Sequence, residues 1–397
     1  MTEPIVAAFA PWCFPAAQLD VLLAEAGIDL LLASSKHNIR YLLDGHHHHF
    51  FAHMDAIGTS RYLPILVYPT RRPGDAAYVA NRNEKDAIAV RAAEGRALWA
   101  GTVLPAASGS AEAMGVAIGH LRRIGVSPRT IGVELGFLPA DAYLALHDAF
   151  PEAKIVEAHR PLERMRAVKT PAELLLLRDA SDRVVDAMLA VIGSHGPGTT
   201  KRQLEAALRR EESERGLVFE YALITVGSGH GRAPSNEVWQ AGDILSLDSG
   251  GNLDGYIGDL CRMAILGEPD AELEDLLGLV EHAQMAARAP IRPGIPGVAI
   301  YDAARDAMAA LPANASFVAH GMGLIGHEAP RLTAKGPIPY SDCDAALPLQ
   351  AGMVVSIETT LPHPTRGFIK LEDTVAVTED GWEGFGDRFR GWNRGAA

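Results

Sequence analysis

The chain has 397 residues, of which 48% are hydrophobic and 21% charged, and this is the composition of a globular protein. The length exceeds what one ordinary hydrophobic core supports, so two domains are expected. The formal net charge of −13 argues against nucleic acid or an anionic membrane as a partner.

Other features of the sequence concern its compartment. Cys13, Cys261 and Cys343 form no CxxC pair and are odd in number, so no disulfide framework is expected. The N-terminus lacks a basic segment followed by a long apolar run, so we expect no signal peptide. No uninterrupted apolar stretch approaches about eighteen residues, the length that indicates a membrane span. Together these features predict a cytoplasmic protein.

The first part of the chain alternates between helical and strand-like patterns. Helical patterns cover residues 16–26 and 111–124, and strand patterns cover residues 29–34, 63–68, 77–80 and 130–133. This alternation predicts an α/β domain with a mixed sheet.

The pattern changes near residues 157–169, and we expect two domains at residues 1–160 and 161–397. Thr170 and Glu173 form a capping box with Pro171 at the first helical position, which predicts a helix from there to about residue 192. Further helices are expected at residues 200–215, 270–287 and 298–311, and strands at residues 220–226, 244–248, 255–264, 353–358 and 369–378. Helix pairs between antiparallel strand pairs predict a layered α+β domain.

Two aspartates stand in strand patterns of the second domain. Asp248 ends an apolar strand, where a charge is costly without a partner, and Asp259 follows eleven residues later. A hairpin between the two strands would bring both carboxylates together. A lone aspartate at either position would instead be interpreted as a turn or cap residue.

The second domain holds further metal-ligand types. His320 and His327 lie in a glycine-rich stretch, HGMGLIGHEAP, whose glycines let the backbone approach a site closely, although a surface loop is the alternative. Glu358 and Glu372 lie inside strand-like runs, where an isolated glutamate usually faces solvent. Two aspartates, one histidine and two glutamates together suit a dinuclear centre of manganese, iron, cobalt or zinc. Four carboxylates would cancel the charge of two divalent ions.

These motifs resemble those of the pita-bread metallopeptidases, which include Xaa-Pro dipeptidase, aminopeptidase P, methionine aminopeptidase and the related creatinase. The matching segments are a D-x10-D pair at residues 248 and 259, an HGxGxxxHExP stretch at 320–330, a GMVxSIE strand at 352–358 and a (R/K)xEDTV strand at 370–375. Residues 38–42 (NIRYL) resemble the creatinase-type N-terminal domain. The resemblance implies an α+β protein, with a smaller α/β creatinase-type domain before a C-terminal pita-bread domain.

The resemblance also implies roles for the individual residues. The expected ligands of two divalent ions are Asp248, Asp259, His320, Glu358 and Glu372, with manganese favoured and zinc, cobalt or iron as alternatives. Asp259 and Glu372 would bridge the ions. A bridging hydroxide would attack the substrate carbonyl, while Glu358 would shuttle the proton and His327 would stabilise the tetrahedral intermediate. Creatinase lacks these ligands and works without metal, so their presence here implies a metal-loaded enzyme.

Three departures from the family pattern concern the substrate. The substrate-facing histidine before the first ligand strand is replaced by Gly231, and His230 is the candidate for its role. In proline-specific members a histidine stands where this chain has Ser316, and an arginine where it has Lys370. Because arginine and lysine bind carboxylates differently, these changes weaken the expectation of Xaa-Pro cleavage without affecting the metal site. His230, His327 and Lys370 are expected to contact substrate.

A run of four histidines occupies residues 46–49. Histidine-rich tracts can bind metal, but we favour a polar loop over a second metal site. In the family, loops of the N-terminal domain can reach the active site of a partner subunit. A homodimer is therefore expected, in which His48, His49 and Phe50 would shape substrate entry.

The function we favour is metal-dependent hydrolysis of a small amide by an Xaa-Pro dipeptidase-like enzyme, with a dipeptide or other small molecule as substrate. A hydrolase of a non-peptide amide or amidine, creatine- or ectoine-like, is the alternative. A lyase like the dimethylsulfoniopropionate-cleaving relatives is disfavoured, because those relatives carry an extra acidic ligand where Gly250 stands. A non-catalytic binding module is disfavoured, because such relatives have typically lost ligands.

Overall fold

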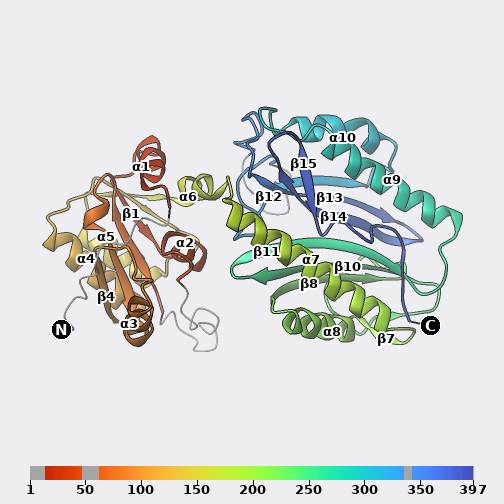
Figure 1. Cartoon of the computed structure of the whole chain (residues 1–397), viewed down its shortest axis with the longest axis horizontal. Coiled ribbons are helices and arrows are strands. Elements are labelled where there is room, and N and C mark those ends of the chain that lie inside the picture. Colours follow the sequence, from red (N-terminus) through yellow and green to blue (C-terminus); the bar gives the residue numbers. More distant parts are fainter. Residues whose placement is uncertain (1–13, 47–61, 335–341, 397) are drawn as a thin grey trace. The chain divides into compact units, whose positions relative to one another are not determined.

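The structure is a computed structural model that describes residues 14–46, 62–334 and 342–396 (Figure 1). His48, His49 and Phe50, expected near the substrate, lie outside the described residues. Within the described ranges, no helix has both the length and the apolar character needed to cross a membrane.

The chain divides into two compact units, Met1–Met165 and Arg166–Ala397. The boundary expected at residues 160/161 lies inside helix α6 (His159–Arg166), and the division between the units falls at the end of that helix.

The N-terminal unit is built on a six-stranded sheet. Its strands are β1 (Leu30–Ala33), β2 (Ile65–Pro69), β3 (Ala77–Asn81), β4 (Thr102–Ala107), β5 (Thr130–Val133) and β6 (Lys154–Glu157), in the order β4-β3-β2-β1-β5-β6. Its helices are α1 (Ala16–Glu25), α2 (Lys36–Leu42), α3 (Lys85–Ala93), α4 (Ser110–Arg123) and α5 (Ala140–Ala149), with 3-10 turns η3 (Pro73–Asp75) and η4 (Arg82–Glu84). Strand β1 pairs antiparallel with β2 and parallel with β5, which confirms the predicted mixed sheet.

The central strands β1, β2 and β3 of this sheet are buried on both faces. Leu31 shares a hydrophobic cluster with Leu23 of α1, whereas the neighbouring Leu30 shares a different cluster with Met114 of α4. Strands covered on both faces are apolar along their whole length, which is why these strands read as continuous apolar runs in the sequence.

The C-terminal unit is built on an eight-stranded sheet. Its strands are β8 (Val218–Val226), β10 (Ile244–Leu253), β11 (Tyr256–Ile265), β12 (Ser316–Gly321), β13 (Val354–His363), β14 (Gly367–Val377), β15 (Trp382–Phe385) and β16 (Asn393–Arg394). The main path runs β12-β13-β14-β11-β10-β8, with β15 beside β14 and β16 beside β11. The helices are α7 (Pro171–Ser194), α8 (Lys201–Glu214), α9 (Ala271–Arg288) and α10 (Ala299–Ala309), and β7 (Thr199–Thr200) pairs with β9 (Val238–Trp239).

The helices of this unit cover the sheet in two pairs: α7 and α8 pack against β8, β10 and β11, and α9 and α10 against β12, β13 and β14 (Figure 1). The predicted capping box at Thr170 and Glu173 does begin α7. Helix α7 approaches β11 so closely that a Cβ added to Gly258 would lie 2.7 Å from the backbone nitrogen of Ser181. Because side chains alternate along a strand, Asp259 points to the opposite face, away from α7.

Candidate metal centre

One row of paired residues crosses four strands of the sheet. Asp248 on β10 lies opposite Cys261 on β11, Cys261 lies opposite Glu372 on β14, and Glu372 lies opposite Glu358 on β13. Directly paired residues share one face of a sheet. The register therefore brings three carboxylates that are far apart in the sequence onto a single face.

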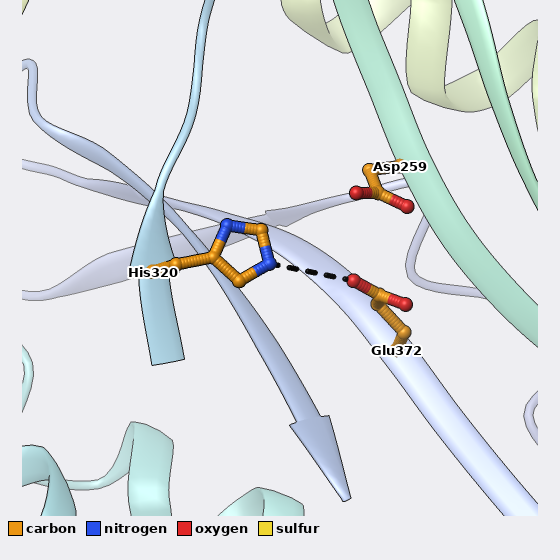
Figure 2. A group of neighbouring side chains, drawn as sticks. All are labelled: Asp259, His320 and Glu372. Atoms are coloured by element: carbon orange, nitrogen blue, oxygen red, sulfur yellow. Dashed lines mark ion pairs between the residues drawn. The ribbon is translucent and has the colours of Figure 1, made fainter. Parts of the chain in front are cut away.

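Asp259 and His320 join this group from offset positions. His320 on β12 pairs with Ser356, two residues before Glu358, and Asp259 holds the equivalent offset on β11. A period of two keeps both side chains on the same face as the row. Asp259, His320 and Glu372 each offer one potential ligand atom, all within 4.8 Å of one another, and their side chains converge in Figure 2.

The chemistry of this trio fits a divalent cation. Asp259 Oδ1 and His320 Nε2 are buried without a hydrogen-bond partner among the described residues. Buried polar atoms of this kind are costly unless another group satisfies them. His320 Nε2 lies 3.7 Å from Glu372 Oε1 and 4.0 Å from Glu358 Oε1. Carboxylate oxygens with one imidazole suit manganese, iron, cobalt or zinc.

A buried ammonium group lies among the remaining carboxylates. Lys370 Nζ lies 2.7 Å from one oxygen of each of three residues, Asp248, Glu358 and Glu372. The guanidinium of Arg232 contacts Asp248 as well. Lys370 was expected to contact substrate, and that contact stays a prediction. The sequence gives no indication of the position of Arg232, because the segment before β10 has no motif that assigns it.

Tyr221 is a further residue of the site, and no motif in the sequence indicates it. It lies on β8 opposite Gly250, and burial together with the carboxylate of Asp259 raises the pKa of its hydroxyl well above the ordinary value. A Cβ added to Gly250 would overlap the ring of Tyr221. A side chain at position 250 would therefore have to displace this ring.

The acids of the site are perturbed in the way expected of a crowded, buried cluster. Burial raises the pKa of Asp248 to about 6 even though the Lys370 ammonium opposes the rise. Burial, with the carboxylates of Glu372 and Asp248, raises the pKa of Asp259 well above its ordinary value. Glu372 differs: burial opposes its ionisation, but Lys370 and His320 outweigh burial and lower its pKa. A cation beside Asp259 would favour its ionised form.

The expected oxyanion-stabilising histidine lies beside the trio. The ring of His327 stacks on that of His320, with centroids 3.8 Å apart and an angle of 19° between the planes. Burial, together with His320, lowers the pKa of His327 to about 3, so the imidazole is neutral near pH 7. The next residue, Glu328, is fully buried and accepts hydrogen bonds from Arg166 (2.8 Å) and Lys169 (3.1 Å). These bonds hold the loop that carries His327.

The other residues singled out in the sequence lie outside the converging trio. His230 is exposed, and its Nε2 lies 3.1 Å from the backbone oxygen of His363. Ser316 is exposed on β12, four residues before His320 and on the same face. His46, the first of the four histidines, is buried and bonds Glu84 at 2.8 Å, which is a structural contact within the N-terminal unit.

A buried acid behind the site leads to a prediction about stability. Glu212 of α8 is fully buried; its Oε1 accepts a hydrogen bond from Ser249 (2.7 Å), and burial raises its pKa to about 8 from an ordinary value of 4.5. The folded protein thus holds this proton more tightly than the unfolded chain, so the stability contribution is complete below about pH 4.5 and is lost as the pH rises through about 8. Glu212→Gln should remove that loss.

We therefore expect Glu212→Gln to be more stable than the parent protein at pH 8. Its free energy of unfolding, measured in urea, should be higher by at least about 1 kcal/mol, and this difference should shrink toward pH 5. Glu214→Gln, at an exposed position of the same helix, is the matched control and should show no such trend. A gap for Glu212→Gln that does not change with pH would contradict the assignment.

Comparison with known proteins places this chain in a family. The profile "Metallopeptidase family M24" matches residues 176–379, and "Creatinase/Prolidase N-terminal domain" matches residues 16–168. A probable dipeptidase PepE of Mycobacterium tuberculosis is 34% identical over 253 residues, which are 62% of this chain and 64% of that protein. An Xaa-Pro dipeptidase of Lactobacillus helveticus is 26% identical over 276 residues, 67% of this chain and 73% of the relative.

The fold is also that of solved relatives. An Xaa-Pro dipeptidase from Bacillus anthracis superposes with a TM-score of 0.77 at 22% identity, over 96% of this chain and 98% of the other. The creatinase/prolidase match falls almost entirely within the N-terminal unit, and the M24 match lies within the C-terminal unit, so the family matches agree with the division into two units. The chain belongs to metallopeptidase family M24, with a creatinase-type N-terminal domain before a pita-bread metallohydrolase domain.

Proposed function

We propose that this protein is a metal-dependent dipeptidase that hydrolyses Xaa-Pro dipeptides. The observation that carries the proposal is the convergence of Asp259, His320 and Glu372. Two buried atoms that could bind a metal, Asp259 Oδ1 and His320 Nε2, lack hydrogen-bond partners among the described residues. The names of the relatives, a probable dipeptidase and an Xaa-Pro dipeptidase, support the substrate class.

Five residues would hold two divalent ions, manganese in preference to zinc, cobalt or iron. These ligands are Asp248, Asp259, His320, Glu358 and Glu372. Asp259 and Glu372 lie between the other ligands, so they are the residues suited to bridge. Divalent ions, when bound, lower the pKa of water and polarise the substrate carbonyl, which supplies a nucleophile near neutral pH.

The chain's own residues would then move the proton and stabilise charge. The Glu358 side chain is 14% exposed, against 1–3% for those of Asp248, His320 and Glu372, so it is the ligand within reach of substrate. It would take the proton of the nucleophile and pass it to the leaving nitrogen. The neutral imidazole of His327 would donate a hydrogen bond to the carbonyl oxygen as negative charge develops there.

A second candidate function has one observation in its favour. Gly231 and Ser316 stand where proline-specific members carry histidines, and His230 bonds the backbone of His363. The substrate side of the site therefore lacks two expected imidazoles, which suits a hydrolase of a creatine- or ectoine-like amide or amidine. A homodimer in the cytoplasm, with His48, His49 and Phe50 near the partner's site, stays a prediction.

A substrate panel separates the two functions. We expect manganese-loaded protein to hydrolyse Leu-Pro and Met-Pro, to act on Leu-Ala at least about tenfold more slowly, and to lose activity with a chelator. The measurement is the amount of proline released, which is quantified by chromatography. If no dipeptide is cleaved while a creatine- or ectoine-type compound is, the alternative function replaces the first.

A further inference from the structure

The Lys370 ammonium group is enclosed by carboxylates. Its Nζ donates a hydrogen bond to Asp248 and forms ion pairs with Glu358 and Glu372, and each of the three carboxylate oxygens is 2.7 Å away. The lysine side chain is 3% exposed. The charge of this ammonium group therefore lies where three of the five expected metal ligands converge.

The ligand set consequently divides in two. One part, Asp248, Glu358 and one oxygen of Glu372, is organised around the ammonium group. The other part consists of Asp259 and His320. Their atoms Oδ1 and Nε2 could bind a metal and have no hydrogen-bond partner among the described residues. The second Glu372 oxygen, Oε1, lies on the His320 side, 3.7 Å from Nε2.

The charges of the site also favour one divalent ion over two. Four carboxylates contribute four negative charges, and Lys370 together with Arg232 neutralises two of them. One divalent ion would neutralise the remaining two. A second divalent ion would leave a buried excess of positive charge, which is unfavourable unless a cation moves away.

We propose that Lys370 occupies the second cation position of the centre. The first divalent ion binds to Asp259, His320 and Glu372, and a second ion enters only by displacing the ammonium group from its carboxylates. Lysine is suited to this role because its ammonium is a compact point charge on a flexible stem. This inference rests on the proposed metal-dependent function and deepens it.

Metal titration of the intact wild-type protein tests the inference directly. After removal of metal with a chelator, manganese binding is followed by isothermal titration calorimetry, and the metal retained after dialysis is counted by mass spectrometry. We expect one tightly bound ion per chain and a second that binds at least about 100-fold more weakly. Paramagnetic resonance of the one-ion protein should show manganese without exchange coupling.

A second experiment uses a variant of Lys370. Lys370→Met keeps the length of the stem and removes the charge, so the second ion should bind at least about tenfold more tightly and exchange coupling between the two ions should appear. Lys169→Met is the matched control, because this buried lysine bonds Glu328, which keeps Arg166 as a partner. The control should bind metal as the wild type does.

The outcomes are distinct. Two ions of comparable affinity in the wild-type protein would overturn the role of Lys370, whether or not the variant folds, and would leave the proposed function intact. An unchanged second affinity in folded Lys370→Met would also overturn it. Absence of any bound ion in the wild type at millimolar manganese would overturn the proposed function itself.

Discussion

Replacing His320 by alanine is expected to abolish both metal retention and hydrolysis. His320 is the only imidazole in the converging trio, and it is fully buried with Nε2 directed toward Glu372. Loss of a group that only orients a metal ligand lowers metal affinity by about 10–100-fold, so loss of the ligand itself should lower it by at least about 100-fold. Metal content after dialysis and kcat on Leu-Pro are the two measurements.

His327→Ala is the matched comparison, because the ring of His327 stacks on that of His320 yet is not one of the expected ligands. It should keep its metal and lose about 10²–10³-fold in kcat, as expected when one stabiliser of the oxyanion is removed. Equal metal content in His320→Ala and His327→Ala would mean that His320 is not a ligand.

The second large effect is expected on stability rather than on activity. Asp373, next to Glu372 on β14, is fully buried and forms ion pairs with three arginines: Arg262 (2.8 Å), Arg288 (2.6 Å) and Arg390. Asp373→Ala would leave these guanidinium groups with too little negative charge, and breaking a buried pair in this way costs about 3–5 kcal/mol. The free energy of unfolding in urea should fall by that amount.

Asp380→Ala is the control for this prediction, because Asp380 follows the same strand but is exposed, and its loss should change stability by no more than about 0.5 kcal/mol. The arginines around Asp373 also reach the chain after β15: Arg288 pairs with Asp387 at 3.0 Å, and Arg262 donates to the backbone oxygen of Arg388 at 2.8 Å. If Asp373→Ala were as stable as Asp380→Ala, the cluster would contribute little.

Much of the fold was predictable because local rules decided it. The capping box at Thr170 and Glu173 begins α7 as expected, since its hydrogen bonds involve only neighbours in sequence. Strand β12 and helices α2, α3 and α5 were not predicted as elements. Each has ten residues or fewer, and the conformation of such short segments depends on the elements that they pack against rather than on a strong pattern of their own.

The sequence by itself determined the order and chemical type of the metal-ligand candidates, because Asp248, Asp259, His320, Glu358 and Glu372 stand in motifs that can be recognised without knowing which strands pair. Only the tertiary structure decided that Lys370 lies among three of these carboxylates, that Arg232 contacts Asp248, and that the ring of Tyr221 lies against Gly250. Those contacts arise from the register of β8, β10, β11, β13 and β14, which brings Lys370 to Asp248 across 122 positions of the chain. No spacing along the chain encodes such a register; the burial of the opposite face of the sheet against its helices selects it.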